Sequence, residues 1–177
     1  SLLALAASLL PNLTVGFLLA PHCLNQSVAS RDGAIVTLAA VLCGGMPNIG
    51  HSGAALAGIV NLTATAAFVW AQYGIRVNAV APGYVASSGM DAYPPAMRET
   101  IRAFPQTVPR KRFGNEAEVS AAIIFMLSSA ASYITVTTLR TNGGQPTVRP
   151  GWPLPTGWHA CGHYNHWRRA SLQPDPR

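Results

Sequence analysis

GIRVNAVAPGYV, residues 74–85, is the most informative segment of this 177-residue chain. Residues 75–80 have the length and the β-branched content of a strand that is buried inside a sheet. The Ala81-Pro82-Gly83 step then ends the strand, because proline has no N–H for further strand pairing and glycine favours a turn. The segment therefore predicts a buried strand that ends in a sharp turn.

Helix and strand patterns alternate on both sides of this strand. An apolar run over residues 34–40 has the length of a buried strand, and residues 52–72 form a long alanine- and leucine-rich stretch that ends before Gly74. Further elements are expected as a helix over residues 12–29, a short helix near 97–103, a helix over 115–127 and a strand over 137–140. This alternation, with short links, predicts an α/β fold with a parallel sheet and right-handed crossovers.

The composition excludes several classes of protein. Hydrophobic residues make up 49% of the chain and charged residues 10%, whereas a disordered chain needs low hydrophobicity and many charges. The net charge of +6 is concentrated after Leu139, where five arginines accompany one aspartate. Nucleic-acid binding proteins instead cluster lysine and arginine on one face or in a known module, so we expect no nucleic-acid partner.

The first 24 residues contain no Asp, Glu, Lys or Arg. A membrane span needs about 20 consecutive apolar residues, but Pro11, Asn12 and Thr14 interrupt this segment. A signal peptide would carry a basic region ahead of its apolar run, and this sequence has none. Three widely spaced cysteines do not predict a disulfide framework. We therefore expect a cytoplasmic protein, with a small membrane-associated protein as the weaker alternative.

Four phrases occur in a fixed order along the chain. They are Asn12-Leu13-Thr14, GGMPNIGHSGAALAGIVNLT at residues 44–63, GIRVNAVAPGYV at 74–85, and RFGNEAEVSAAIIFMLSSAASYIT at 112–135, followed by Gly143-Gly144. Together they resemble the short-chain dehydrogenase/reductase family, and the second phrase resembles its branch of enoyl-CoA reductases and citronellol-type dehydrogenases. The resemblance implies an oxidoreductase that uses NAD(P) on a carbonyl, an alcohol or an enoyl-CoA.

The resemblance covers about residues 12–144 and implies an order of segments. An apolar N-terminal segment over residues 1–11 precedes the C-terminal half of a Rossmann-like domain over 12–145, and an irregular basic tail follows over 146–177. The expected fold class is α/β, a partial Rossmann-like doubly wound parallel sheet that lacks the N-terminal strands. The resemblance also implies that the nicotinamide meets a loop formed by Pro82, Gly83, Tyr84 and Val85. A plain turn without a binding role is the alternative for this loop.

The chemistry of the family needs a tyrosine as acid or base and a lysine four residues later on the same helix face. The lysine cation lowers the phenol pKa from about 10, so that proton transfer becomes possible near neutral pH. The alignment implied by the resemblance places Ser52 and Leu56 at these positions, and the register of the enoyl-reductase branch places Val60 and Ala64 there. The chain has one lysine, Lys111, with no tyrosine four residues before it.

Other positions of the family's site are also altered. Ala39 or Ala40 replaces the strand serine that holds the substrate oxygen, whereas Asn12 matches the family's catalytic asparagine. His51 precedes the tyrosine position, and histidine is the side chain type most often used as an acid or base in catalysis, so it is the candidate for a substitute acid or base, with a structural histidine as the alternative. The Gly-rich turn that brings a pyrophosphate to a helix N-terminus is absent from this sequence, which starts at about the family's middle helix.

Two functions of different classes are compatible with these observations. The first is an NAD(P)-dependent oxidoreductase homologue whose hydride transfer is impaired in this chain, and whose cofactor binding is doubtful. The second is a truncated, inactive paralogue that forms a homo-oligomer through its two apolar helices, residues 12–29 and 52–72, since a helix that is apolar on all sides is normally buried.

The tail contains a group of possible metal ligands: His159, Cys161, His163 and His166. These are nitrogen and sulfur ligands of the kind that zinc or copper binds. Their spacing matches no structural zinc pattern, and no second cluster accompanies them. We therefore expect no metal site.

Overall fold

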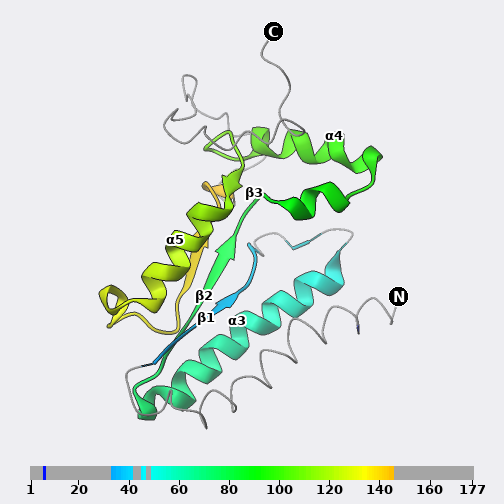
Figure 1. Ribbon diagram of the computed structural model, residues 1–177. Helices are drawn as coiled ribbons and strands as arrows, with labels where there is room; N and C mark the ends of the chain where they lie inside the picture. Colours follow the sequence, from blue (N-terminus) through cyan, green and yellow to red (C-terminus); the bar gives the residue numbers. More distant parts are fainter. Residues whose placement is uncertain (1–5, 7–32, 42–44, 47–48, 146–177) are drawn as a thin grey trace.

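The computed structural model describes residues 6, 33–41, 45–46 and 49–145 (Figure 1). The helix expected over residues 12–29, which includes Asn12, lies outside the described residues. The histidine- and cysteine-containing tail also lies outside them. The account of the fold below concerns the described part of the chain.

A three-stranded parallel sheet forms the centre of the molecule. Its strands are β1 (Ala34–Leu38), β2 (Arg76–Pro82) and β5 (Thr138–Thr141), and their order in the sheet is β1-β2-β5. Ala34 pairs with Arg76, and Ala79 pairs with Thr138. All three strands agree with the sequence-based expectations to within two residues at each end. The central strand is the IRVNAV segment, whose interior is buried between two neighbouring strands and two helices.

Helix α3 (Gly50–Trp70) covers one face of this sheet and continues as the 3-10 turn η3 (Ala71–Tyr73). Gly74 ends it with φ of 70°, a left-handed conformation that glycine adopts without strain. The face of α3 toward the sheet buries small and β-branched side chains, which are Ala55, Ile59, Thr63, Ala66 and Ala67. These pack on the alternate residues Val77, Ala79 and Ala81 of β2.

A buried hydroxyl pair accompanies this apolar packing. Thr63 Oγ1 lies 2.8 Å from Thr37 Oγ1 of β1, and it donates to the carbonyl of Ile59 at 2.8 Å. Both hydroxyls therefore have partners, which removes most of the cost of burying them.

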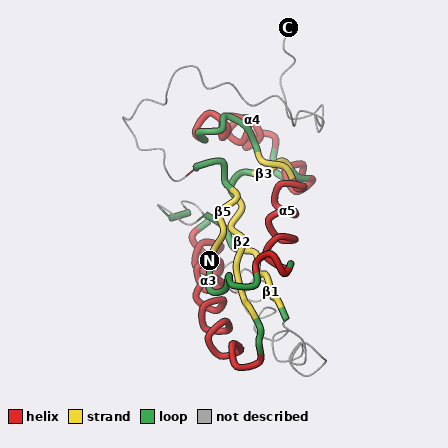
Figure 2. The backbone as a smooth tube through the Cα atoms, turned by 90° about the vertical axis from the view of Figure 1, so that its left-hand side faces the viewer, coloured by secondary structure: helices red, strands yellow, loops and turns green. Residues whose placement is uncertain are grey.

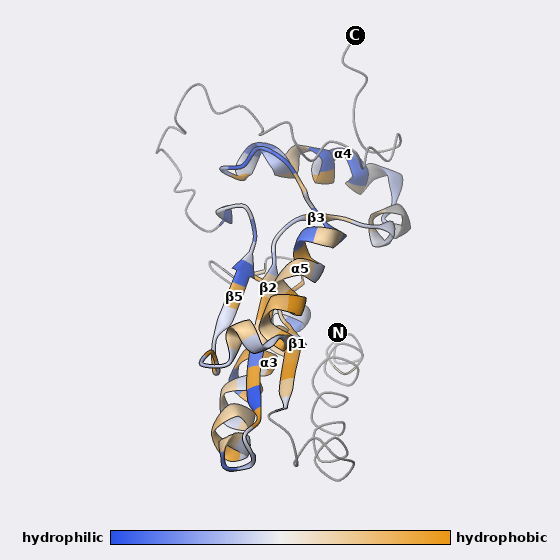
Figure 3. Ribbon diagram, turned by 60° about the vertical axis from the view of Figure 1, so that its left-hand side comes forward, coloured by the Kyte–Doolittle hydropathy of each residue, from blue (hydrophilic) through white to orange (hydrophobic). Residues whose placement is uncertain are grey.

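Residues Gly50–Tyr73 are long and apolar enough to cross a membrane by length and composition. Core helices of α/β domains meet the same two criteria, and α3 packs along β2 and β1. Figure 3 places the most hydrophobic stretches of β1, β2 and α3 at the centre of the molecule. The length and composition of α3 are therefore only weak evidence for a membrane-spanning helix.

Helix α5 (Glu116–Leu127) covers the opposite face of the sheet, so the strands lie between two helical layers (Figure 2). Met126 of α5 is buried against Val80 of β2, with Val36, Ile123 and Leu139 packed around them. Successive residues of β2 thus contact opposite layers, as the two-residue period of a strand requires. This arrangement confirms the expected doubly wound, parallel α/β fold.

The connection between α5 and β5 is bound to β2 by two polar side chains. The Arg76 guanidinium donates to the carbonyls of Met126, Ser128 and Ile134 at 2.9, 3.1 and 3.3 Å. Asn78, which is fully buried, donates to the Ile134 carbonyl at 2.8 Å and accepts from the N–H of Thr137 at 3.1 Å. The carbonyls at the end of α5 therefore have a cationic partner, which also suits the negative end of the helix dipole.

The start of α5 carries a complete cap. The Asn115 side chain accepts from the N–H of Glu118 at 2.9 Å, and Glu118 accepts in return from the N–H of Asn115 at 3.0 Å. Glu118 also binds Arg112 through both oxygens, at 2.6 and 2.8 Å. The sequence correctly predicts the helix start at Asn115, whereas the pairing with Arg112 is a new finding.

Between β2 and α5 the chain forms several short elements. These are β3 (Val85–Ala86), the 3-10 turn η4 (Ser88–Ala92), α4 (Pro95–Ala103), the 3-10 turn η5 (Phe104–Thr107) and β4 (Gly114–Asn115). The helix expected near residues 97–103 is confirmed as α4. The parallel pairing of β3 with β4 was not predicted, because two-residue strands carry no usable periodicity.

We predict that Arg76→Lys lowers the free energy of unfolding by about 3 kcal/mol, because one ammonium group cannot reproduce three guanidinium hydrogen bonds to partly buried carbonyls. Urea unfolding monitored by circular dichroism measures the change. Arg98→Lys is the control, since Arg98 is exposed and donates to the nearby Tyr93 carbonyl. Equal stability of both variants would contradict the structural role of Arg76.

Glu118 predicts a pH dependence of stability. The hydrogen bond from Arg112 is the main cause that holds the pKa of Glu118 below its ordinary value of 4.5, against the opposing effect of partial burial. A carboxyl with a depressed folded-state pKa adds stability above its unfolded-state pKa, and this contribution disappears as pH falls below about 4.5. We therefore expect Glu118→Gln to destabilise the protein at pH 7, with a difference from wild type that shrinks below pH 4.5.

The measurement is urea unfolding of wild type and Glu118→Gln across this pH range. Glu116→Gln is the matched control, because Glu116 lies in the same first turn of α5 and is exposed. A stability difference for Glu118→Gln that stays constant down to pH 3 would be inconsistent with the ion pair as its source.

Candidate functional site

The carboxyl ends of the three parallel strands meet at one edge of the sheet. Ligands of open α/β sheets bind outside such an edge, in the loops that follow the strands. Helix α3 connects β1 to β2 and runs antiparallel to both, so its N-terminal end lies at the same edge. The loop after β2, the loop after β5 and the start of α3 are therefore the parts of the described chain to consider as a site.

The loop after β2 is held in place by backbone contacts on two sides. Gly83 donates its N–H to the Thr141 carbonyl at 3.2 Å, and the Tyr84 carbonyl accepts from Gly114 at 2.9 Å. A Cβ on Gly83 would lie 2.8 Å from Cα of Asn142, so only glycine fits this close approach. The structure thus brings together the four predicted residues of the cofactor loop: Pro82, Gly83, Tyr84 and Val85.

The Tyr84 ring is also fixed. It stacks on the Phe104 ring with centroids 4.4 Å apart and an interplanar angle of 23°. Phe104 begins η5, directly after α4. The stack therefore connects the loop after β2 with the segment that follows it in sequence.

The loop after β5 contains polar atoms that the sequence analysis did not single out. Asn142 Oδ1 accepts from the N–H of Gly144 at 3.1 Å, and Gly143 and Gly144 both have positive φ, at 60° and 87°. Three buried side-chain atoms in this loop have no hydrogen-bond partner among the described residues: Thr141 Oγ1, Asn142 Nδ2 and Gln145 Oε1. The sequence feature that could have pointed to this loop is the Asn-Gly-Gly sequence directly after the expected strand.

The first turn of α3 contains the positions that the resemblance assigns to catalysis. Ser52 Oγ lies 3.1 Å from Nδ1 of His51, and both side chains are half-buried. Leu56 follows Ser52 by four residues and so lies on the same side of the helix. The alternative positions Val60 and Ala64 also lie on α3, and none of these four residues is a tyrosine or a lysine.

No cluster of three or more metal-ligating side chains occurs within residues 33–41, 45–46 and 49–145. Three titratable residues lie on the described elements of this edge: His51 at the start of α3, Tyr84 in the loop after β2 and Arg140 on β5. Asn12 cannot be related to this edge, because it lies outside the described residues.

Comparison with known proteins identifies the family. A family model described as Enoyl-(Acyl carrier protein) reductase matches residues 6–145. A 3-oxoacyl-[acyl-carrier-protein] reductase of Staphylococcus epidermidis is 37% identical over 121 residues, which are 67% of this chain and 48% of that protein. The chain spans about half the length of the curated relatives it matches.

Solved structures with similar folds support the same family. The citronellol catabolism dehydrogenase of Pseudomonas aeruginosa PAO1 is 43% identical, with a TM-score of 0.67 over 80% of this chain and 54% of that one. A short-chain oxidoreductase from the same organism, solved with NADPH and described as containing an atypical catalytic center, is 26% identical, with a TM-score of 0.69 over 79% of this chain and 56% of that one. This chain belongs to the short-chain dehydrogenase/reductase family.

Proposed function

We propose that this chain is a short-chain dehydrogenase/reductase homologue that keeps the nicotinamide-side loop of an NAD(P) site but does not transfer hydride by the tyrosine–lysine route. The proposal is supported mainly by the identity of two side chains on α3. Ser52 and Leu56 occupy the i and i+4 positions where the resemblance implies a tyrosine and a lysine. The chain's one lysine, Lys111, lies between η5 and β4, away from this helix.

The physical consequence is the loss of proton transfer. A carbonyl oxygen that accepts hydride must gain a proton, and a positioned acid of suitable pKa contributes typically 10²–10⁴-fold to such a step. A serine hydroxyl is a far weaker acid than a tyrosine whose pKa is lowered by a neighbouring lysine cation. Leu56 offers no charge to stabilise a phenolate or an alkoxide.

The loop of Pro82, Gly83, Tyr84 and Val85 fits the nicotinamide end of the cofactor. It lies at the carboxyl end of β2, and its backbone is held by Thr141 on one side and Gly114 on the other. When bound, the dinucleotide would supply or accept the hydride. In this proposal the loop after β2 contacts only the nicotinamide end of the dinucleotide, because a pyrophosphate needs a glycine-rich turn at a helix N-terminus.

His51 is the residue that we propose as a substitute acid on α3. Its Nδ1 lies within hydrogen-bond distance of the hydroxyl of Ser52, which occupies the tyrosine position. A histidine can donate a proton near neutral pH.

The test is NADPH oxidation by the purified 177-residue chain with a 3-oxoacyl thioester or an aliphatic aldehyde as substrate, followed at 340 nm. We expect no rate above the enzyme-free background, because the acid and the cation are both missing from α3. An active short-chain dehydrogenase/reductase assayed in parallel is the positive control. Substrate-dependent, saturable NADPH oxidation would overturn the proposal, and its loss in His51→Ala would then identify His51 as the acid.

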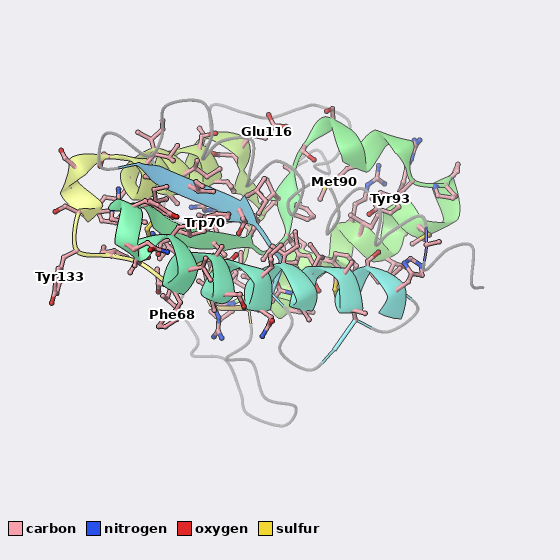
Figure 4. All side chains as sticks on the ribbon, turned by 90° about the horizontal axis from the view of Figure 1, so that it is seen from below. Phe68, Trp70, Met90, Tyr93, Glu116 and Tyr133 are labelled. Atoms are coloured by element: carbon pink, nitrogen blue, oxygen red, sulfur yellow. The ribbon has the colours of Figure 1, made fainter. Side chains whose placement is uncertain are left out.

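A second candidate function is self-association through α3. The side of α3 turned away from the sheet is exposed and contains Ala54, Ala57, Asn61, Thr65 and Phe68. Phe68 is 82% exposed and projects away from the strands (Figure 4). Exposure of a large aromatic side chain next to small residues suits a close helix–helix contact. The sequence analysis expected this helix to be apolar on all sides. Asn61 and Thr65 are polar, so the exposed side of α3 is less apolar than expected.

For this second candidate, Phe68→Glu is expected to weaken dimerisation by at least about 100-fold, because burying a phenyl ring contributes up to about 3 kcal/mol and a buried carboxylate opposes association. Sedimentation equilibrium of the whole chain measures it. Tyr133→Glu is the matched control, since Tyr133 is fully exposed on the connection between α5 and β5. A monomeric wild type, or equal association of all variants, would rule the candidate out.

A further inference from the structure

A pocket of about 380 Å³ lies beside the loop after β5, and Tyr84 is the residue of the proposed cofactor loop that lines it. It is bounded by the end of β5, by the first turn of α5 and by the segment over residues 108–114. Its size is within the range of sites for small organic ligands. The charged residues that line it are three arginines and one glutamate: Arg110, Arg112, Arg140 and Glu118.

The charges in this pocket do not cancel. Both carboxylate oxygens of Glu118 are bound by Arg112, which makes this ion pair neutral as a unit. Arg110 and Arg140 are exposed, and in the described part of the chain neither takes part in a salt bridge. Arg110 is near enough to Glu118 to lower the pKa of that carboxyl by a Coulomb effect. Two positive charges are therefore left for an anion to neutralise.

The backbone holds both of these arginines at the pocket. Arg140 lies on β5 and pairs with Ala81 of the central strand. Arg110 donates its N–H to the Gly143 carbonyl at 3.2 Å, and a Cβ on Gly143 would lie 3.3 Å from Cβ and Cγ of Arg110. The stems of the two side chains are thus positioned by a strand and by close packing on the loop after β5, which reduces the entropy cost of binding a ligand between them.

The loop after β5 lines the pocket with Thr141 and Asn142. Asn142 Oδ1 accepts from the N–H of Gly144, which holds this side chain against the loop. Guanidinium groups without a carboxylate partner favour an anion with several acceptor oxygens.

The remaining wall is apolar. Tyr84, fixed by its stack on Phe104, lines the pocket together with Val108 and Val119. A ligand that fills this volume therefore has an apolar or aromatic part in addition to its anionic group.

We propose that this pocket binds a phosphate monoester, with the phosphate on Arg110 and Arg140 and the organic group against Tyr84. Guanidinium groups match phosphate oxygens in geometry and charge, and a phosphate has enough oxygens to engage both arginines. The site is separate from the tyrosine–lysine chemistry of α3. It does not depend on NAD(P) binding.

Isothermal titration of the 177-residue chain with phenyl phosphate, inorganic phosphate and phenol, each at the same ionic strength in sodium chloride, tests the proposal. We expect saturable binding of phenyl phosphate, binding of inorganic phosphate that is weaker by about 10-fold, and no binding of phenol. The variant Arg110→Gln/Arg140→Gln should weaken phenyl phosphate binding by at least about 10-fold, since it removes both guanidinium groups that bind the phosphate.

Arg98→Gln is the matched control, because it removes one exposed positive charge from α4 without touching the pocket. It should bind phenyl phosphate within twofold of wild type, and circular dichroism checks that all variants are folded. Absence of saturable phenyl phosphate binding, equal affinity for phenyl phosphate and inorganic phosphate, or unchanged binding by the double variant would each overturn the proposal.

Discussion

The fold depends on the polar contacts that β2 makes with the connection between α5 and β5. Arg76 and Asn78 of β2 bind carbonyls on this connection, and the strand also accepts from Val136 at the Val77 carbonyl at 2.9 Å. Val136 has φ of 64°, an unfavourable conformation for a β-branched residue, which these neighbouring hydrogen bonds offset. Because the same strand buries alternate side chains against α3 and α5, these contacts fix α5 and β5 relative to the rest of the sheet.

Much of this architecture was predictable from the sequence, for identifiable reasons. The strand at residues 75–80 has a run of apolar and β-branched residues that ends at Pro82-Gly83, and α5 begins where asparagine is followed three residues later by glutamate. Long periodic elements of this kind carry a strong local signal. The two-residue strands β3 and β4 and the hydrogen bonds of Arg76 could not be predicted, because they depend on residues about 30 to 60 positions apart.

The candidate site was predictable in part. The loop of Pro82, Gly83, Tyr84 and Val85 is at the expected edge, and the reason for Gly83 is the close approach of Asn142, which only the structure reveals. The absence of a tyrosine–lysine pair at i and i+4 could be read from composition, since the one lysine, Lys111, has no tyrosine four residues before it. The arginine pocket was missed because Arg110, Arg112 and Arg140 are separated in sequence and come together only through the packing of residues 108–110 on the loop after β5.

This family member forms the parallel sheet around β2, and the proposed function assigns it a nicotinamide-side loop without tyrosine–lysine proton transfer. Titration of the 177-residue chain with NADH and NADPH, followed by nicotinamide fluorescence, tests this claim most directly. Because the proposed function assigns only the nicotinamide end of the dinucleotide to the loop after β2, we expect no saturable change up to millimolar cofactor. Saturable binding at micromolar concentrations would contradict it, because a complete cofactor site would then form in this chain.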